Sequence, residues 1–147
     1  MKKAGSTSDF TEARNKELLG AVRRLVMDPR CKSMTDVYAR AVMQPCSRFW
    51  VSERRAAEVI SKMLRGEDQD WKSVPLRSKM YRELCRRVMA WREENPGHHL
   101  SDAVFEAVNS PAPEFYLTPE SAAVIVSRVM KRNAERRRAE LKQKQNH

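Results

Sequence analysis

Basic side chains are the residues of this chain whose type and spacing point most clearly to a chemistry, and that chemistry is phosphate binding. The 147 residues include 29 lysines and arginines against 19 aspartates and glutamates, which gives a formal net charge of +10. Lysine and arginine neutralise nucleic-acid phosphates, and arginine also reads guanine edges. The predicted nucleic-acid-binding residues are Arg48, Arg54, Arg55, Lys62, Arg65, Arg136, Arg137 and Arg138.

Residues suited to catalysis or metal binding are few and poorly spaced. His98 and His99 are neighbours in a loop, and His147 is terminal. No cysteine or histidine pair has zinc-ligand spacing, and the four glycines form no phosphate-binding loop. No set of a nucleophile with its base is evident either. We therefore expect a protein that is not an enzyme and needs no cofactor or metal.

The cysteines and the apolar runs bear on the compartment. Three cysteines, an odd number, are scattered along the chain at Cys31, Cys46 and Cys85. This pattern suits a reducing cytosol better than a disulfide framework. No apolar run approaches the roughly 20 residues that span a bilayer, and the start of the chain lacks the apolar core of a signal peptide. These features predict a cytoplasmic protein that does not act at a membrane.

The chain matches itself without a gap when it is shifted by 66 residues, so that 14–66 lies over 80–132. A shared helical period would align apolar positions, but it would not also align a proline, an aromatic pair and the helix caps. The sequence therefore predicts an internal duplication. Identical pairs include Glu17/Glu83, Val42/Val108, Pro45/Pro111, Phe49/Phe115, Ala56/Ala122 and Ser61/Ser127.

Each repeat is predicted to form three helices. Apolar spacing and caps place them near 11–27, from 35 to before Pro45, and from 52 to 65, then near 77–94, 101–109 and 118–132. Thr35, Ser52 and Thr118 are the expected caps, and Gly66 the expected stop. In the connectors before the third helices, we expect Phe49 and Phe115 in the core and Trp50 and Tyr116 half-exposed.

These elements predict an all-α protein of two tandem three-helix repeats packed together, with a basic C-terminal helical extension. About 53 residues is near the lower limit for an independent core, so the repeats should pack on each other. Trp71 is expected to pack against one of them. The predicted divisions are a disordered arm (1–9), the first repeat (10–66), a linker (67–76), the second repeat (77–132) and the helical tail (133–147).

The two repeats differ in charge. Residues 14–66 carry +7, residues 80–132 are balanced, and the tail from 133 carries +3. In its helix arrangement, each repeat resembles the tri-helical domains of the helix-turn-helix group, although the connector is longer than the usual turn. That resemblance implies that the third helix of repeat one enters the DNA major groove. Arg54 and Arg55 would then contact guanine edges or phosphate, and Arg48 and Lys62 would bind phosphate.

A second resemblance concerns the stretches from Pro45 to Ala57 and from Pro111 to Ala123. They are similar to those of short basic proteins of bacterial mobile elements and phages. The resemblance implies a bacterial, cytoplasmic protein that acts near DNA, and it brings no known activity.

Binding to double-stranded DNA is the favoured function, and three alternatives stay open. The balanced second repeat, with Glu114, Glu120 and Val124 on its third helix or connector, suits a protein partner or self-association. RNA binding would use Trp50 and Tyr116 to stack on bases. The basic residues of the third helix could also be no more than a solvated face.

Overall fold

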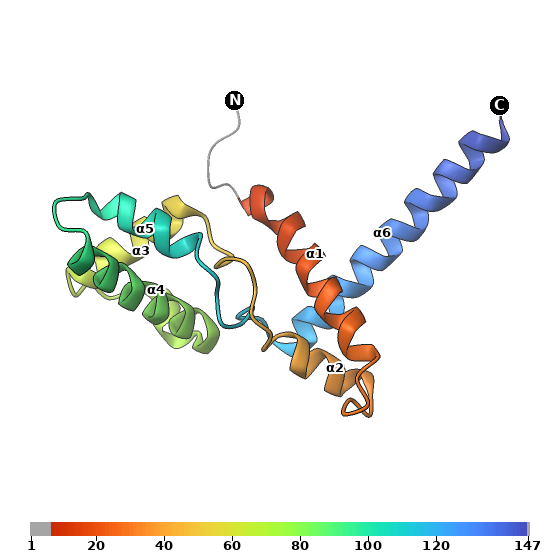
Figure 1. Ribbon diagram of the computed structural model, residues 1–147, viewed down its shortest axis with the longest axis horizontal. Helices are drawn as coiled ribbons and strands as arrows, with labels where there is room; N and C mark the ends of the chain where they lie inside the picture. Colours follow the sequence, from red (N-terminus) through yellow and green to blue (C-terminus); the bar gives the residue numbers. More distant parts are fainter. Residues whose placement is uncertain (1–6, 147) are drawn as a thin grey trace.

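Six α-helices and one short 3₁₀ helix form the part of the chain described by the computed structural model, residues 7–146 (Figure 1). No strand occurs among these residues, so the predicted all-α class is confirmed for them. In chain order the elements are α1 (Thr7–Val26), α2 (Met34–Ala41), α3 (Glu53–Leu64), η1 (Asp70–Ser73), α4 (Pro75–Glu94), α5 (Leu100–Val108) and α6 (Pro119–Gln145).

The two ends of the chain differ in how they match the prediction. Residues 1–6 of the expected disordered arm lie outside the described residues, and 7–9 already belong to α1. The expected helical extension is confirmed, because α6 runs without interruption to Gln145. Its last part consists of exposed residues, so this part contributes no core.

The helices group in space in a way that the sequence order does not suggest. Helices α1 and α2 pack with α6, and α4 and α5 pack with α3 (Figure 1). Each group therefore takes two helices from one of the predicted repeats and the third helix from the other. The divisions 10–66 and 77–132 describe the sequence, whereas the packed units are α1–α2–α6 and α3–α4–α5.

Two connectors, 42–52 and 108–118, carry α3 and α6 each into the group of the other, and we call this the exchange of the third helices. The connectors meet in the middle of the molecule. Cys46 and Ala112 form an isolated antiparallel bridge, with N···O distances of 3.0 and 2.9 Å. The amide of Phe49 donates to the carbonyl of Val108 at 3.0 Å, and the amide of Phe115 donates to Val42 at 2.9 Å. A shift of 66 residues turns each of these bonds into its counterpart.

Aromatic side chains fill the space around this crossing. Phe49 stacks with Tyr116 at 5.9 Å between ring centroids, and Trp50 stacks with Phe115 at 6.3 Å. Phe49 and Phe115 are buried and Tyr116 is half-buried, as predicted. The prediction for Trp50 is wrong: its exposed fraction is only 9%, because Phe10 of α1 covers its other side. Burial, followed by the nearby Glu114 and Glu83, raises the pKa of Tyr116 to about 12.

Helix caps follow the sequence at the third helices and depart from it at α2. The hydroxyl oxygen of Ser52 accepts from the Arg55 amide at 3.0 Å, and that of Thr118 accepts from the Ser121 amide at 3.0 Å. The predicted cap at Thr35 is wrong. Ser33 caps α2 instead, because the chain enters the helix two residues earlier than the apolar pattern indicates.

The predicted linker contains η1, which holds Trp71 against the second group. Trp71 is buried, and its ring lies 4.9 Å from that of Tyr81 in α4. Trp71 was expected to pack against one repeat, and its ring partner Tyr81 belongs to the predicted second repeat. The rest of this segment brings the chain from the end of α3 to Pro75, the first residue of α4.

Candidate nucleic-acid interface

The predicted contacts on α3 are exposed, but their charges are partly satisfied within the helix. The side chains of Arg54 and Arg55 are 77% and 52% exposed, and each lies 3.6 Å from a carboxylate oxygen of Glu58. Arg65 bonds to Glu67 at 2.6 Å and to the Ser61 hydroxyl at 3.0 Å. Exposed pairs of this kind are weak, yet a phosphate would still compete with a carboxylate for each arginine.

Arg48 has a structural role that the sequence did not reveal. Its guanidinium donates to the carbonyl of Phe49 at 2.9 Å and to that of Val51 at 2.7 Å. It also lies 5.4 Å from the ring centroid of Phe10 in α1. These contacts link the first connector to α1, so Arg48 stabilises the region where the two connectors meet.

The remaining predicted contacts lie on two separate parts of the molecule. Lys62 is exposed on α3, whereas Arg136, Arg137 and Arg138 are exposed on α6, whose C-terminal part extends away from the other helices (Figure 1). Because α3 and α6 belong to different packed groups, the structure does not bring the two predicted sets together.

A basic surface that the sequence indicated only in part lies where α1 and α6 pack together: Arg136 and Arg137 were predicted contacts, whereas its other bases were not. One hollow of about 190 Å³ is lined by Lys16 of α1 and by Arg132 and Arg136 of α6, with Glu12, Asn15, Leu19, Val129 and Asn133. A second hollow of about 260 Å³ is lined by Arg23, Asn133, Arg136, Arg137 and Glu140. The two hollows share Asn133 and Arg136 and therefore adjoin. We call Lys16, Arg23, Arg132, Arg136 and Arg137 the α1/α6 basic surface.

The cations of the α1/α6 basic surface are exposed, and within residues 7–146 none of the five forms an ion pair. They differ in this respect from Arg54, Arg55 and Arg65. No sequence pattern joins Lys16 to Arg136, because their proximity results from the packing of α6 on α1. The only available signal was the high count of bases in both helices.

A third basic stretch runs along α4 but is largely neutralised. Lys79 forms a short ion pair with the buried Glu114, and Arg86 bonds to Glu83 at 2.6 Å. Hydrogen bonds from Arg86 and from Arg87 hold the pKa of Glu83 at about 2, well below its usual value. Lys79 and Arg86 line a hollow of about 570 Å³ together with Arg82, Tyr116 and others, but both are paired with acids of the protein itself.

Other kinds of site find little support in the described residues. There, no three side chains of the metal-ligating types come together as a cation would require. Across the same range, none of the helices has both the length and the apolar character needed to cross a bilayer.

Comparison with known proteins gives no further assignment: no family model, curated protein or solved structure matches this chain.

Proposed function

We propose that this protein binds nucleic acid without catalysing a reaction, that its ligand is double-stranded DNA, and that the α1/α6 basic surface is the principal contact. One observation carries the proposal. Five exposed cations line two adjoining hollows, and none of them has an ion-pair partner among residues 7–146.

The physical argument rests on what each cation gives up on binding. An unpaired lysine or arginine gains a phosphate and releases condensed counterions from the DNA, which drives association. Arg54 and Arg55 would have to exchange Glu58 for the phosphate, so their net gain is smaller. The part of α6 beyond Arg132 is about 20 Å long at the helical rise. That length spans several phosphates of one strand.

We also propose that the chain is a duplicated three-helix unit with exchanged third helices. The 66-residue sequence match and the paired hydrogen bonds at the crossing support this. In this arrangement α3 remains the third helix of a three-helix group, as in helix-turn-helix domains, and serves as a secondary contact. The duplication gives one scaffold two surfaces of different charge.

The test measures binding of a labelled DNA duplex by fluorescence anisotropy across a salt series, with single-stranded DNA and structured RNA as competitors. The variant Arg132→Glu/Arg136→Glu/Arg137→Glu is compared with Arg54→Glu/Arg55→Glu/Lys62→Glu, which changes charge equally. We expect the α6 variant to lose duplex affinity by about 100-fold or more and to lower the salt slope by about three. The α3 variant should lose much less.

Three outcomes would contradict the proposal in different ways. Equal losses in both variants would show that net charge alone drives binding. A larger loss in the α3 variant would return the principal contact to α3. Absence of binding at low salt would favour a protein partner, for which the exposed Phe105 of α5 and Val124 of α6 are available.

A further inference from the structure

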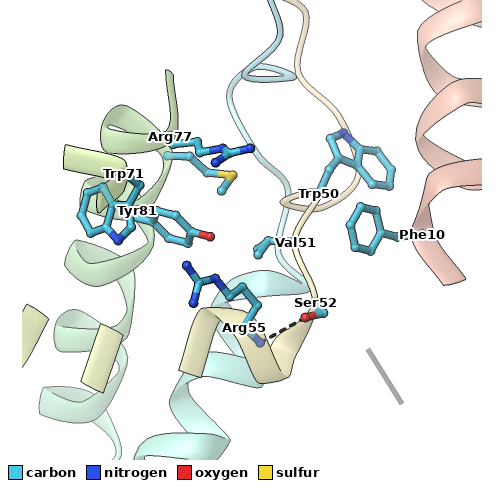
Figure 2. Close-up of a pocket in the computed structure, with 9 residues that line it drawn as sticks. Phe10, Trp50, Val51, Ser52, Arg55, Trp71, Arg77 and Tyr81 are labelled. Atoms are coloured by element: carbon cyan, nitrogen blue, oxygen red, sulfur yellow. Dashed lines mark hydrogen bonds between the residues drawn. The ribbon is translucent and has the colours of Figure 1, made fainter. Parts of the chain in front are cut away.

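A cavity of about 280 Å³ opens between the two packed groups, on residues that the α1/α6 basic surface does not use (Figure 2). Its lining comes from α1, the first connector, α3, η1 and α4, so both sequence repeats contribute. The lining residues are Phe10, Trp50, Val51, Ser52, Arg55, Trp71, Arg77, Met80 and Tyr81.

Two guanidinium groups face each other across this cavity. Arg55 enters it from α3 and Arg77 from α4, and the hydroxyl of Tyr81 points into the space between them (Figure 2). None of the described lining side chains is acidic. Within residues 7–146 Arg77 forms no ion pair, and Arg55 pairs only with Glu58, at 3.6 Å, which does not line the cavity. Two cations therefore converge without a matching negative charge in the cavity.

Aromatic rings form much of the remaining wall. Trp71 and Tyr81 pack at 4.9 Å with a tilt of 50°, and Phe10 and Trp50 pack at 6.4 Å with a tilt of 34°. Trp71 is 5% exposed, and its indole N–H has no acceptor within residues 7–146. This nitrogen is buried and does not open into the cavity, so Trp71 contributes the apolar face of its ring to the site rather than a hydrogen bond.

The pKa of Tyr81 reflects the positive charge of the two arginines. Burial raises the pKa of its hydroxyl, while the positive charges of Arg55 and Arg77 and a hydrogen bond from Arg55 oppose that rise. The Tyr81 hydroxyl lies between the two guanidinium groups in Figure 2, so both positive charges act on it from either side.

We propose that this cavity binds a small phosphorylated aromatic molecule of the nucleotide class, with its phosphate between Arg55 and Arg77 and its ring against the aromatic wall. The planar guanidinium fork matches phosphate oxygens in a bidentate way. Aromatic side chains stack on bases regardless of their identity. The cavity volume is near the lower end for small-molecule sites, which suits a single nucleotide.

Tryptophan fluorescence offers a direct measurement, because Trp50 and Trp71 line the cavity. Trp91 packs on His98 at the other end of α4, so Trp91→Phe would remove the unrelated signal. The probes are adenosine monophosphate, inorganic phosphate and adenosine. We expect saturable quenching by the monophosphate, with binding tighter than that of either fragment.

The variants Arg55→Ala and Arg77→Ala should each weaken binding of the monophosphate by about tenfold or more. Arg54→Ala is the matched control, because Arg54 lies beside Arg55 and also faces Glu58 at 3.6 Å but does not line the cavity. It should leave the affinity unchanged. Far-ultraviolet circular dichroism confirms that the variants keep their helices.

Equal weakening by Arg54→Ala and Arg55→Ala would overturn the site, since it would reflect net charge alone. Absence of saturable quenching would also overturn it, and equal binding of adenosine would exclude the phosphate contact.

A short single-stranded oligonucleotide distinguishes two sources of the nucleotide, a nucleic-acid strand and a free nucleotide. Tighter binding than the monophosphate, with the same dependence on Arg55 and Arg77, would support the site with a nucleic-acid strand as its source. Weaker binding would support it with a free nucleotide as its source.

These outcomes do not depend on duplex binding by α6. The variant Arg132→Glu/Arg136→Glu/Arg137→Glu alters none of the residues that line the cavity, so it should leave monophosphate binding unchanged. The cavity and the α1/α6 basic surface can therefore fail separately.

Discussion

Helices α3 and α6 begin 66 residues apart and begin alike, with Ser52 and Thr118 as hydroxyl caps. They end differently. Gly66, at a φ of 73°, follows α3, and the Glu67 amide bonds back to the carbonyl of Lys62 at 3.0 Å. Arg132 stands at the matching position of α6, and that helix continues to Gln145. Glycine tolerates a positive φ and ends a helix, whereas arginine favours a helix. The residue at this one position, Gly66 or Arg132, therefore separates α3, which ends just before it, from α6, which continues through it.

The charges of the two helices differ for an equally local reason. Glu58 and Glu67, which pair with the arginines of α3, correspond to Val124 and Asn133 in α6. The bases of α6 therefore lack these two acidic neighbours. The two stretches therefore differ in net charge through the acids that the α3 stretch has, and α6 lacks, at these two positions as well as through the bases that α6 has.

Substitutions where the two connectors meet should have the largest effect on stability. Phe49→Ala is expected to lower the free energy of unfolding by about 3–5 kcal/mol, because the ring is fully buried and its removal leaves a cavity. Phe115→Ala, at the matching position, should cost a similar amount. Urea denaturation measures both. Tyr116→Ala is the control and should cost less, since Tyr116 is half-buried; equal losses at all three positions would argue against this difference in burial.

Deletion of residues 133–147 should separate binding from stability. It removes five basic side chains while disturbing little core, because nearly all of the described residues in this stretch are exposed. We expect duplex affinity to fall by about tenfold or more and the free energy of unfolding to change by less than about 0.5 kcal/mol. Unchanged affinity would place the principal contact elsewhere than on the projecting part of α6.

The two helix ends can be tested by changing the residue that distinguishes them. Gly66→Ala should lower the free energy of unfolding by about 1 kcal/mol, because alanine disfavours a positive φ and no atom near Gly66 would otherwise clash. Arg132→Gly should instead reduce the helical circular dichroism signal of the extension, whereas Arg132→Ala should preserve it. A loss of signal in Arg132→Ala as well would show that the arginine side chain, rather than helix propensity, stabilises the extension.

The smallest expected effect concerns the matching acids Glu17 and Glu83. Glu17 accepts the Ser47 amide at 2.9 Å, whereas Glu83 accepts Arg86 and Arg87. The pKa of Glu83 is about 2 in the folded protein against 4.5 ordinarily, so it stabilises the fold above pH 4.5. That stability is lost as the pH falls from 4.5 toward 2. Glu83→Gln should therefore flatten the pH dependence of unfolding in this range, and an unchanged slope would contradict the assignment.

The positions of the helices, most of their ends and part of the core could be predicted from the amino-acid sequence. Caps such as Ser52, the stop at Gly66 and the apolar spacing act within a few residues, so they can be read locally. Phe49 and Phe115 were also assignable, because both copies retain phenylalanine between a proline and a cap. The exposed bases of α3 and of the tail were identified as candidates for the same reason.

The packing of the helices, and the surfaces that this packing creates, could not be predicted from the sequence. The exchange of α3 and α6 depends on backbone hydrogen bonds between connectors, such as that of Cys46 with Ala112, and any non-proline residue can form them. The same packing buries Trp50 against Phe10, joins Lys16 to Arg136, and turns Arg55 toward Arg77. These pairs are distant in sequence and share no pattern, so the chain had to fold before their contacts existed.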